Sequence, residues 1–108
     1  NNNKFYNYKI YNTNHYLRLP RISASNSIKA IELNNDILLF DENINSFDNN
    51  GIFLIDNDGS VSAVNIFTKI DGEYAFNYLG FTVANDLSKE QLSKLNIIGK
   101  VLKTISLQ

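Results

Sequence analysis

The sequence contains no cysteine, methionine or tryptophan, and it has only one proline and one histidine. The absence of cysteine excludes disulfide bonds and thiolate metal sites, and it is compatible with a reducing cytoplasm. No apolar run approaches the roughly 20 residues that span a bilayer, and the N-terminus has no signal-peptide pattern. We therefore expect a cytoplasmic location and no membrane association.

The charge balance is nearly neutral, with 10 basic and 11 acidic residues and a formal charge of −1. A surface that binds nucleic acid is usually strongly basic, so this chain lacks that signature. Any contact with DNA is expected only through an upstream domain that the sequence does not contain. The lack of any methionine, and so of a start codon, indicates a piece of a longer protein.

What the chain does contain is enough apolar material for one core. Apolar residues make up 44% of its 108 positions, with 7 Phe and 6 Tyr. This length fits a single domain. We expect residues 1–16 to form an extended, partly disordered arm and residues 17–108 to form one β domain.

Short apolar runs between turn residues predict a mostly β fold. The expected strands cover residues 37–40, 52–55, 61–67, 74–78 and 97–105, and extended structure is also expected at 81–83. Asp58-Gly59 and Asp71-Gly72 are typical of hairpin turns, because both residue types tolerate positive φ. One short helix is predicted at about 89–95, where Ser88 and Gln91 have the spacing of a capping box.

Motifs for metal or cofactor binding are weak or missing. Asp56-Asn57-Asp58-Gly59 resembles the start of a calcium loop, but the position that requires glutamate holds Asn65. The sequence has no glycine-rich phosphate-binding motif. His15, the single histidine, lies in the polar arm and is expected to be a bystander. We therefore expect no metal and no cofactor.

Four blocks, in order, carry a resemblance to a known family. They are Ser25-Asn26-Ser27-Ile28, the segment 34–41, the segment 51–59 and the segment 95–101. They resemble the blocks of the LexA and phage-repressor family of self-cleaving proteins, which shares its fold with bacterial signal peptidases. The resemblance implies a LexA-like β domain over most of the chain.

The same resemblance implies a degenerate catalytic site. The family uses a serine nucleophile and a lysine general base, which fall here on Ser27 and Val64. A serine hydroxyl is a poor nucleophile until a base takes its proton. The nearest lysine along this strand, Lys69, is five residues further on, about 16 Å away, and on the opposite face. Ser25 and Asn35 also replace glycines of the family pattern, so self-cleavage is expected to be lost.

Three functions remain open from the sequence. The chain is expected to be a C-terminal dimerisation and regulatory domain of a phage-repressor-like regulator, forming a homodimer and controlled by another protein. Alternatively, it is an active peptidase that uses Ser27 with a relocated base. As a third alternative, it is an unrelated small β interaction domain in which the four blocks match by chance.

Overall fold

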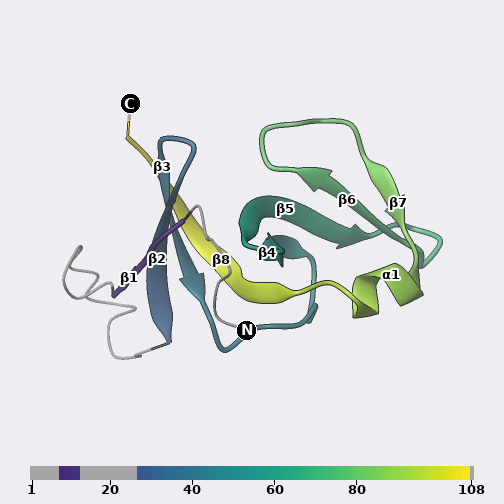
Figure 1. Cartoon of the computed structure of the whole chain (residues 1–108). Helices are drawn as coiled ribbons and strands as arrows, with labels where there is room; N and C mark the ends of the chain where they lie inside the picture. Colours follow the sequence, from purple (N-terminus) through teal and green to yellow (C-terminus); the bar gives the residue numbers. More distant parts are fainter. Residues whose placement is uncertain (1–7, 13–26, 108) are drawn as a thin grey trace.

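The computed structural model describes residues 8–12 and 27–107 of the chain. In this part the chain forms one antiparallel sheet of eight strands and a single short helix (Figure 1). The mostly β fold with one late helix, predicted from the sequence, is therefore confirmed. The elements are β1 (Ile10–Asn12), β2 (Ile28–Leu33), β3 (Asp36–Asp41), β4 (Gly51–Asn57), β5 (Ser60–Thr68), β6 (Tyr74–Tyr78), β7 (Asn85–Leu87), α1 (Lys89–Ser93) and β8 (Ile97–Ser106).

Two hairpins depend on residues that accept a left-handed backbone. Asn34 and Asn35, between β2 and β3, have φ angles of 52° and 67°. Asp58 and Gly59, between β4 and β5, have φ angles of 56° and 92°. Two-residue loops with positive φ at both positions match the right-handed twist of the strands they join. Asn35, which stands where the family pattern has glycine, therefore still makes the turn.

The last strand joins the two halves of the sheet. The strand order is β1-β2-β3-β8-β4-β5-β6-β7, so β8 lies between β3 and β4. Its first residues pair with β4 and its later residues pair with β3. In Figure 1, β8 (yellow) runs from the side that holds α1 to the side that holds β2 and β3.

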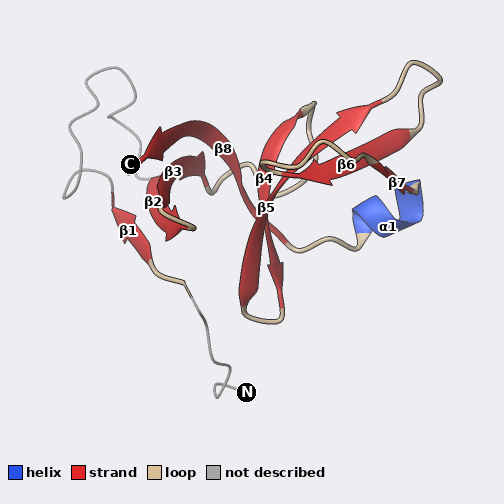
Figure 2. Cartoon of the chain, turned by 90° about the horizontal axis from the view of Figure 1, so that it is seen from above, coloured by secondary structure: helices blue, strands red, loops and turns tan. Residues whose placement is uncertain are grey.

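The hairpin β4–β5 is buried on both faces, because successive side chains of a strand point in opposite directions. Leu54 and Ala63 lie on one face, in a cluster that includes Phe40 of β3. Phe53 and Val64 lie on the other face, in a separate cluster. Both faces therefore carry apolar residues, and Figure 2 shows the hairpin between the two ends of the sheet.

The helix begins with the predicted capping box. Ser88 Oγ accepts the N–H of Gln91 at 3.0 Å, and Gln91 Oε1 accepts the N–H of Ser88 at 2.8 Å. The helix covers Lys89–Ser93, two residues fewer than expected at its C-terminal end. Leu92 and Leu95 pack against the cluster around Phe53.

The N-terminal arm is described only over residues 8–12. There β1 pairs antiparallel with β2, and the Tyr8 hydroxyl donates to Asp56 Oδ2 at 3.0 Å. The rest of the predicted arm lies outside the described residues. At the other end of the sheet, residues 81–83 form no strand, and β7 begins only at Asn85. Phe81 and Val83 are exposed there and lack the buried face that a sheet strand would give them.

Gly99 supplies the close contact that lets β8 lie beside β3. A Cβ atom at this position would overlap the ring of Phe40, which is fully buried. We expect Gly99→Ala to lower the free energy of unfolding by about 2 kcal/mol, the usual cost of overpacking a core. Urea denaturation should measure the loss, with exposed Lys103→Ala on the same strand as the control. Equal midpoints for the two variants would contradict this packing.

Candidate functional site

Val64 lies in the middle of β5, at the position that the resemblance assigns to the lysine base. Its side chain is 5% exposed and packs in an apolar cluster with Phe53, Ile66 and Ile97. It pairs across the sheet with Phe53 on β4 and with Tyr78 on β6. A valine carries no exchangeable side-chain proton, so this position supplies no acid–base chemistry.

Ser27 precedes β2 and is buried, with 8% of its surface exposed. Its carbonyl oxygen accepts the N–H of Glu42 at 2.9 Å, which joins the start of β2 to the end of β3. Three strands (β3, β8 and β4) lie between β2 and β5 in the sheet order. Ser27 is not part of the cluster around Val64. Ser25, Asn26 and His15 lie outside the described residues.

Two lysines near these positions are held in ion pairs. Lys29, two residues after Ser27, lies 3.8 Å from Glu42 Oε2. Lys69, just beyond β5, lies 3.1 Å from Asp86 Oδ1. The hydrogen bond that Lys69 donates to Asp86, together with the charge of Asp86, raises the pKa of Lys69 above the ordinary 10.5. A general base must lose its proton, so pairing of this kind works against that role.

Lys100 lies in the same row of the sheet as Val64, since it pairs with Phe53, which pairs with Val64. Its Nζ lies 5.3 Å from the centre of the Phe53 ring and 3.0 Å from Asp48 Oδ1. A Cβ atom on Gly51 would lie 2.7 Å from Lys100 Cε, so the glycine leaves room for the side chain. Lys100 is therefore fixed between a ring and a carboxylate.

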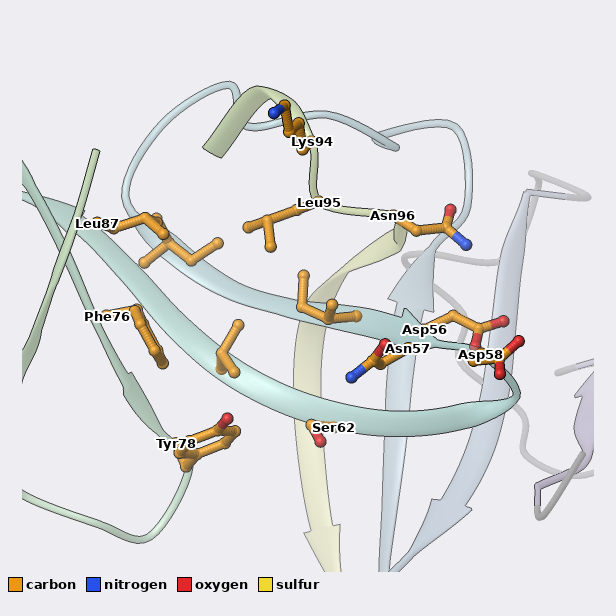
Figure 3. Close-up of a pocket in the computed structure, with 13 residues that line it drawn as sticks. Asp56, Asn57, Asp58, Ser62, Phe76, Tyr78, Leu87, Lys94, Leu95 and Asn96 are labelled. Atoms are coloured by element: carbon orange, nitrogen blue, oxygen red, sulfur yellow. The ribbon is translucent and has the colours of Figure 1, made fainter. Parts of the chain in front are cut away.

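A hollow of about 530 Å³ lies over the face of β5 that carries Val64 (Figure 3). Its apolar lining comes from four strands and from the segment that follows α1, and consists of Ile55, Val64, Ile66, Phe76, Leu87 and Leu95. Its polar lining consists of Asp56, Asn57, Asp58, Ser62, Tyr78, Lys94 and Asn96. Figure 3 shows the two aspartates at one end, by the β4–β5 turn, and Phe76 and Leu87 toward the other.

The lining of this hollow favours binding over catalysis. Ser62 supplies a hydroxyl, but none of the lining residues is a histidine or a cysteine. Lys94, the one lining cation, lies 3.3 Å from Glu90 in an exposed i, i+4 pair. A nucleophile needs an adjacent base that can take its proton, and the lining residues include no such pair. A concave site that combines apolar walls with polar groups is suited to holding a ligand.

The aspartates at the β4–β5 turn have structural partners. Asp56 Oδ1 accepts the N–H of Gly59 at 2.7 Å, and its other oxygen accepts the Tyr8 hydroxyl. Asp56 therefore closes the turn, as the hairpin interpretation of this segment predicts. Over the described ranges 8–12 and 27–107, no three histidine, cysteine or acidic residues come together as a metal site.

The hollow is the feature that sequence reasoning missed. Its walls come from β4, β5, β6, β7 and the segment between α1 and β8, so no single stretch of sequence carries its pattern. The sequence signal for this hollow is the spacing of Val64 and Ile66, two residues apart on β5, together with Phe76 on β6. That spacing predicts a shared apolar face but does not show what covers it.

Comparisons with known proteins give no relative: no family model, no curated protein and no solved structure matches this chain. Among the described residues, no helix is both long and apolar enough to cross a membrane.

The ion pair of Lys100 with Asp48 has a measurable consequence. The hydrogen bond from Lys100 lowers the pKa of Asp48 below its ordinary value of 3.8. Since the folded-state pKa is depressed, the pair stabilises the fold above the unfolded pKa, and this contribution is lost as the pH falls through the folded pKa. Carboxyl NMR titration should show an Asp48 midpoint below 3.8.

Lys100→Gln should return the Asp48 midpoint toward its ordinary value, because the ammonium group that stabilises the carboxylate is removed. Lys103→Gln, which changes an exposed lysine on the same strand, is the matched control and should leave the midpoint unchanged. An Asp48 midpoint that does not respond to Lys100→Gln would show that the pair does not form in solution.

Proposed function

We propose that this chain is the dimerisation and regulatory domain of a phage-repressor-like transcriptional regulator that has lost self-cleavage. The proposal starts from the four sequence blocks and from the pairing of β3 with β8. That pairing unites the second block, at residues 34–41, with the last, at residues 95–101, in one sheet. In this proposal the protein acts in the cytoplasm and contacts DNA only through an upstream domain.

The loss of cleavage is supported by the surroundings of Val64. A lysine in this place could act as a base only if burial kept it neutral. Val64 instead completes an apolar cluster, and the nearby Lys69 and Lys100 are both paired with carboxylates. An active peptidase with a relocated base is the alternative, and it would require one of these ion pairs to open.

The observation that carries the dimer is the open edge of β8. Residues 103–105 pair with β3 on one side, and within the described part of the chain no strand pairs with them on the other. Leu102 is 45% exposed and Leu107 is 50% exposed. An unpaired strand edge presents free N–H and C=O groups that can pair with another chain.

A second copy of this chain fits that edge. Antiparallel pairing about a two-fold axis through Thr104 would set Lys103 opposite Ile105 of the second copy, because directly opposite residues of such a pair point to the same face. Each Lys103 would then face an isoleucine rather than another lysine, so no like charges meet. A two-fold dimer of this kind is the arrangement that places two DNA-binding domains on a palindromic operator.

The unrelated β interaction domain remains the other alternative. It would share the sheet and the open edge but would have no link to a DNA-binding domain. The full-length gene distinguishes the two, since a helix-turn-helix segment before residue 1 is expected only for the repressor.

Self-cleavage is tested directly by incubating the protein at about pH 9 to 10, where lysines begin to lose their protons. We expect no fragments by mass spectrometry, either from this chain or from a longer natural form. Val64→Lys should also remain uncut, because Ser25 and Asn26 also depart from the residues that the family pattern has before the serine. Fragments that disappear in Ser27→Ala would establish an active peptidase and overturn the proposal.

Dimerisation is tested by sedimentation at about 50 µM, within the range expected for a small interface. We expect a dimer in the unmodified chain and a monomer in Leu102→Asp, because the new charge would lie in the paired edge. Ile70→Asp is the matched control, since Ile70 is a fully exposed apolar residue in the β5–β6 turn. A strict monomer in the unmodified chain would count against the proposal.

A further inference from the structure

A second open edge lies on β5, close to the β4–β5 turn. β6 pairs with β5 only from Val64 to Thr68, and one further hydrogen bond runs from Leu79 N–H to the Ala63 carbonyl at 2.9 Å. Beyond this point the chain turns away, since Phe81 N–H donates to the Tyr78 carbonyl. Figure 2 shows the end of the β4–β5 hairpin extending past β6.

The backbone of Val61 faces this open edge. In an antiparallel ladder, residues two apart direct their N–H and C=O groups to the same side. The Ala63 carbonyl points to the β6 side, so the Val61 groups point there as well. Within residues 8–12 and 27–107, no strand pairs with Val61 on this side.

Hollows flank this edge on both faces of the sheet. The hollow of about 530 Å³ lies on the face of Ser62 and Val64. A second hollow of about 340 Å³ lies on the other face, against Val61 and Ala63, and reaches Leu79. Ser62 borders both of them. A strand added to the edge would direct alternate side chains to the two faces and hence toward the two hollows.

The charges around the edge are mainly acidic. Asp56 and Asp58 border the first hollow and Asp36 borders the second. The one cation among these lining residues, Lys94, is already paired with Glu90. A basic residue beside the β4–β5 turn would therefore meet complementary charge, and an acidic one would be repelled.

We propose that the β5 edge from Ser60 to Ser62 binds an extended segment of a partner protein by strand addition. The segment runs antiparallel to β5 in line with β6, places apolar side chains in the two hollows, and carries a basic residue near Asp58 at its C-terminal end. Main-chain hydrogen bonds supply affinity in this mode, and the hollows supply specificity. The inference does not depend on the dimer edge of β8 or on the repressor ancestry.

The test uses the peptide acetyl-Thr-Leu-Val-Leu-Thr-Lys-amide, titrated into the isotopically labelled protein and followed by amide NMR. Saturable shifts are expected at the amides of Val61, Ser62 and Leu79, with a Kd of about 10–100 µM. The Val61 amide should exchange rapidly with solvent in the free protein and become protected in the complex. N-methylation of the peptide's central valine, or glutamate in place of its lysine, should weaken binding at least about tenfold.

Variants of the protein test each part of the site. Ser62→Trp should block binding, whereas Thr68→Trp, on the same face but at the paired end of β5, should not. Asp58→Asn keeps a side chain that tolerates the left-handed turn. Asp58→Asn should weaken binding of the peptide that ends in lysine. It should not weaken binding of the same peptide when threonine replaces that lysine.

Two results would overturn the inference. One is a Val61 amide that is already protected from exchange without peptide, which would mean that a second copy or another segment of the chain covers the edge. The other is the absence of saturable shifts at Val61 up to about 1 mM peptide. Even a weak complex, with a Kd near that concentration, would give such shifts. Neither result depends on the dimer proposed at the β8 edge, which sedimentation of the Leu102→Asp variant reports separately.

Discussion

The two-sided burial of the β4–β5 hairpin is the constraint on which the rest of the structure depends. Phe53 and Leu54 are adjacent residues that are both fully buried, and they enter clusters on opposite faces of the same strand. The first cluster requires β2 and β3 on one side, and the second requires β6, β7 and the helix segment on the other. A one-residue slip of register would exchange the two faces and mismatch both clusters at once. The hairpin thereby fixes where β8 must run, since β8 is the strand that joins β4 to β3.

The two-sided burial of this hairpin also determines which side chains fit at the candidate site. The position that the resemblance assigns to a lysine base falls within the second cluster, where a charged side chain would lose its hydration without gaining a partner. Valine satisfies the packing, and the cations around it are drawn to carboxylates at the margins, as in the pairs of Lys69 with Asp86 and Lys100 with Asp48. A hollow remains above Val64, and its apolar walls are suited to holding a side chain rather than to cleaving a bond.

Within the described residues, two inner strands of the sheet, β8 and β5, have an open edge because they are longer than a neighbouring strand. β8 continues past the end of β4, and the hairpin end of β5 continues past β6. Proteins usually protect such edges with charges, bulges or covering segments. On β8 the edge carries Lys103 between exposed apolar residues, and on β5 it is bordered by aspartates. The two edges thus differ in charge, which is why they are assigned different partners: a second copy for β8 and a basic extended segment for β5.

The sequence by itself determined the local structure. Hairpins at Asn34-Asn35 and Asp58-Gly59 follow from residues that tolerate positive φ, and the helix start follows from the spacing of Ser88 and Gln91. These features depend on neighbours within a few positions, so a local pattern is sufficient. Only the tertiary structure decided the insertion of β8 between β3 and β4, the absence of a strand at residues 81–83, and the hollow above Val64. Each of these depends on which apolar surfaces meet across long sequence separations. Alternation of apolar residues along a strand indicates that one face is buried, but it does not indicate which segment covers that face.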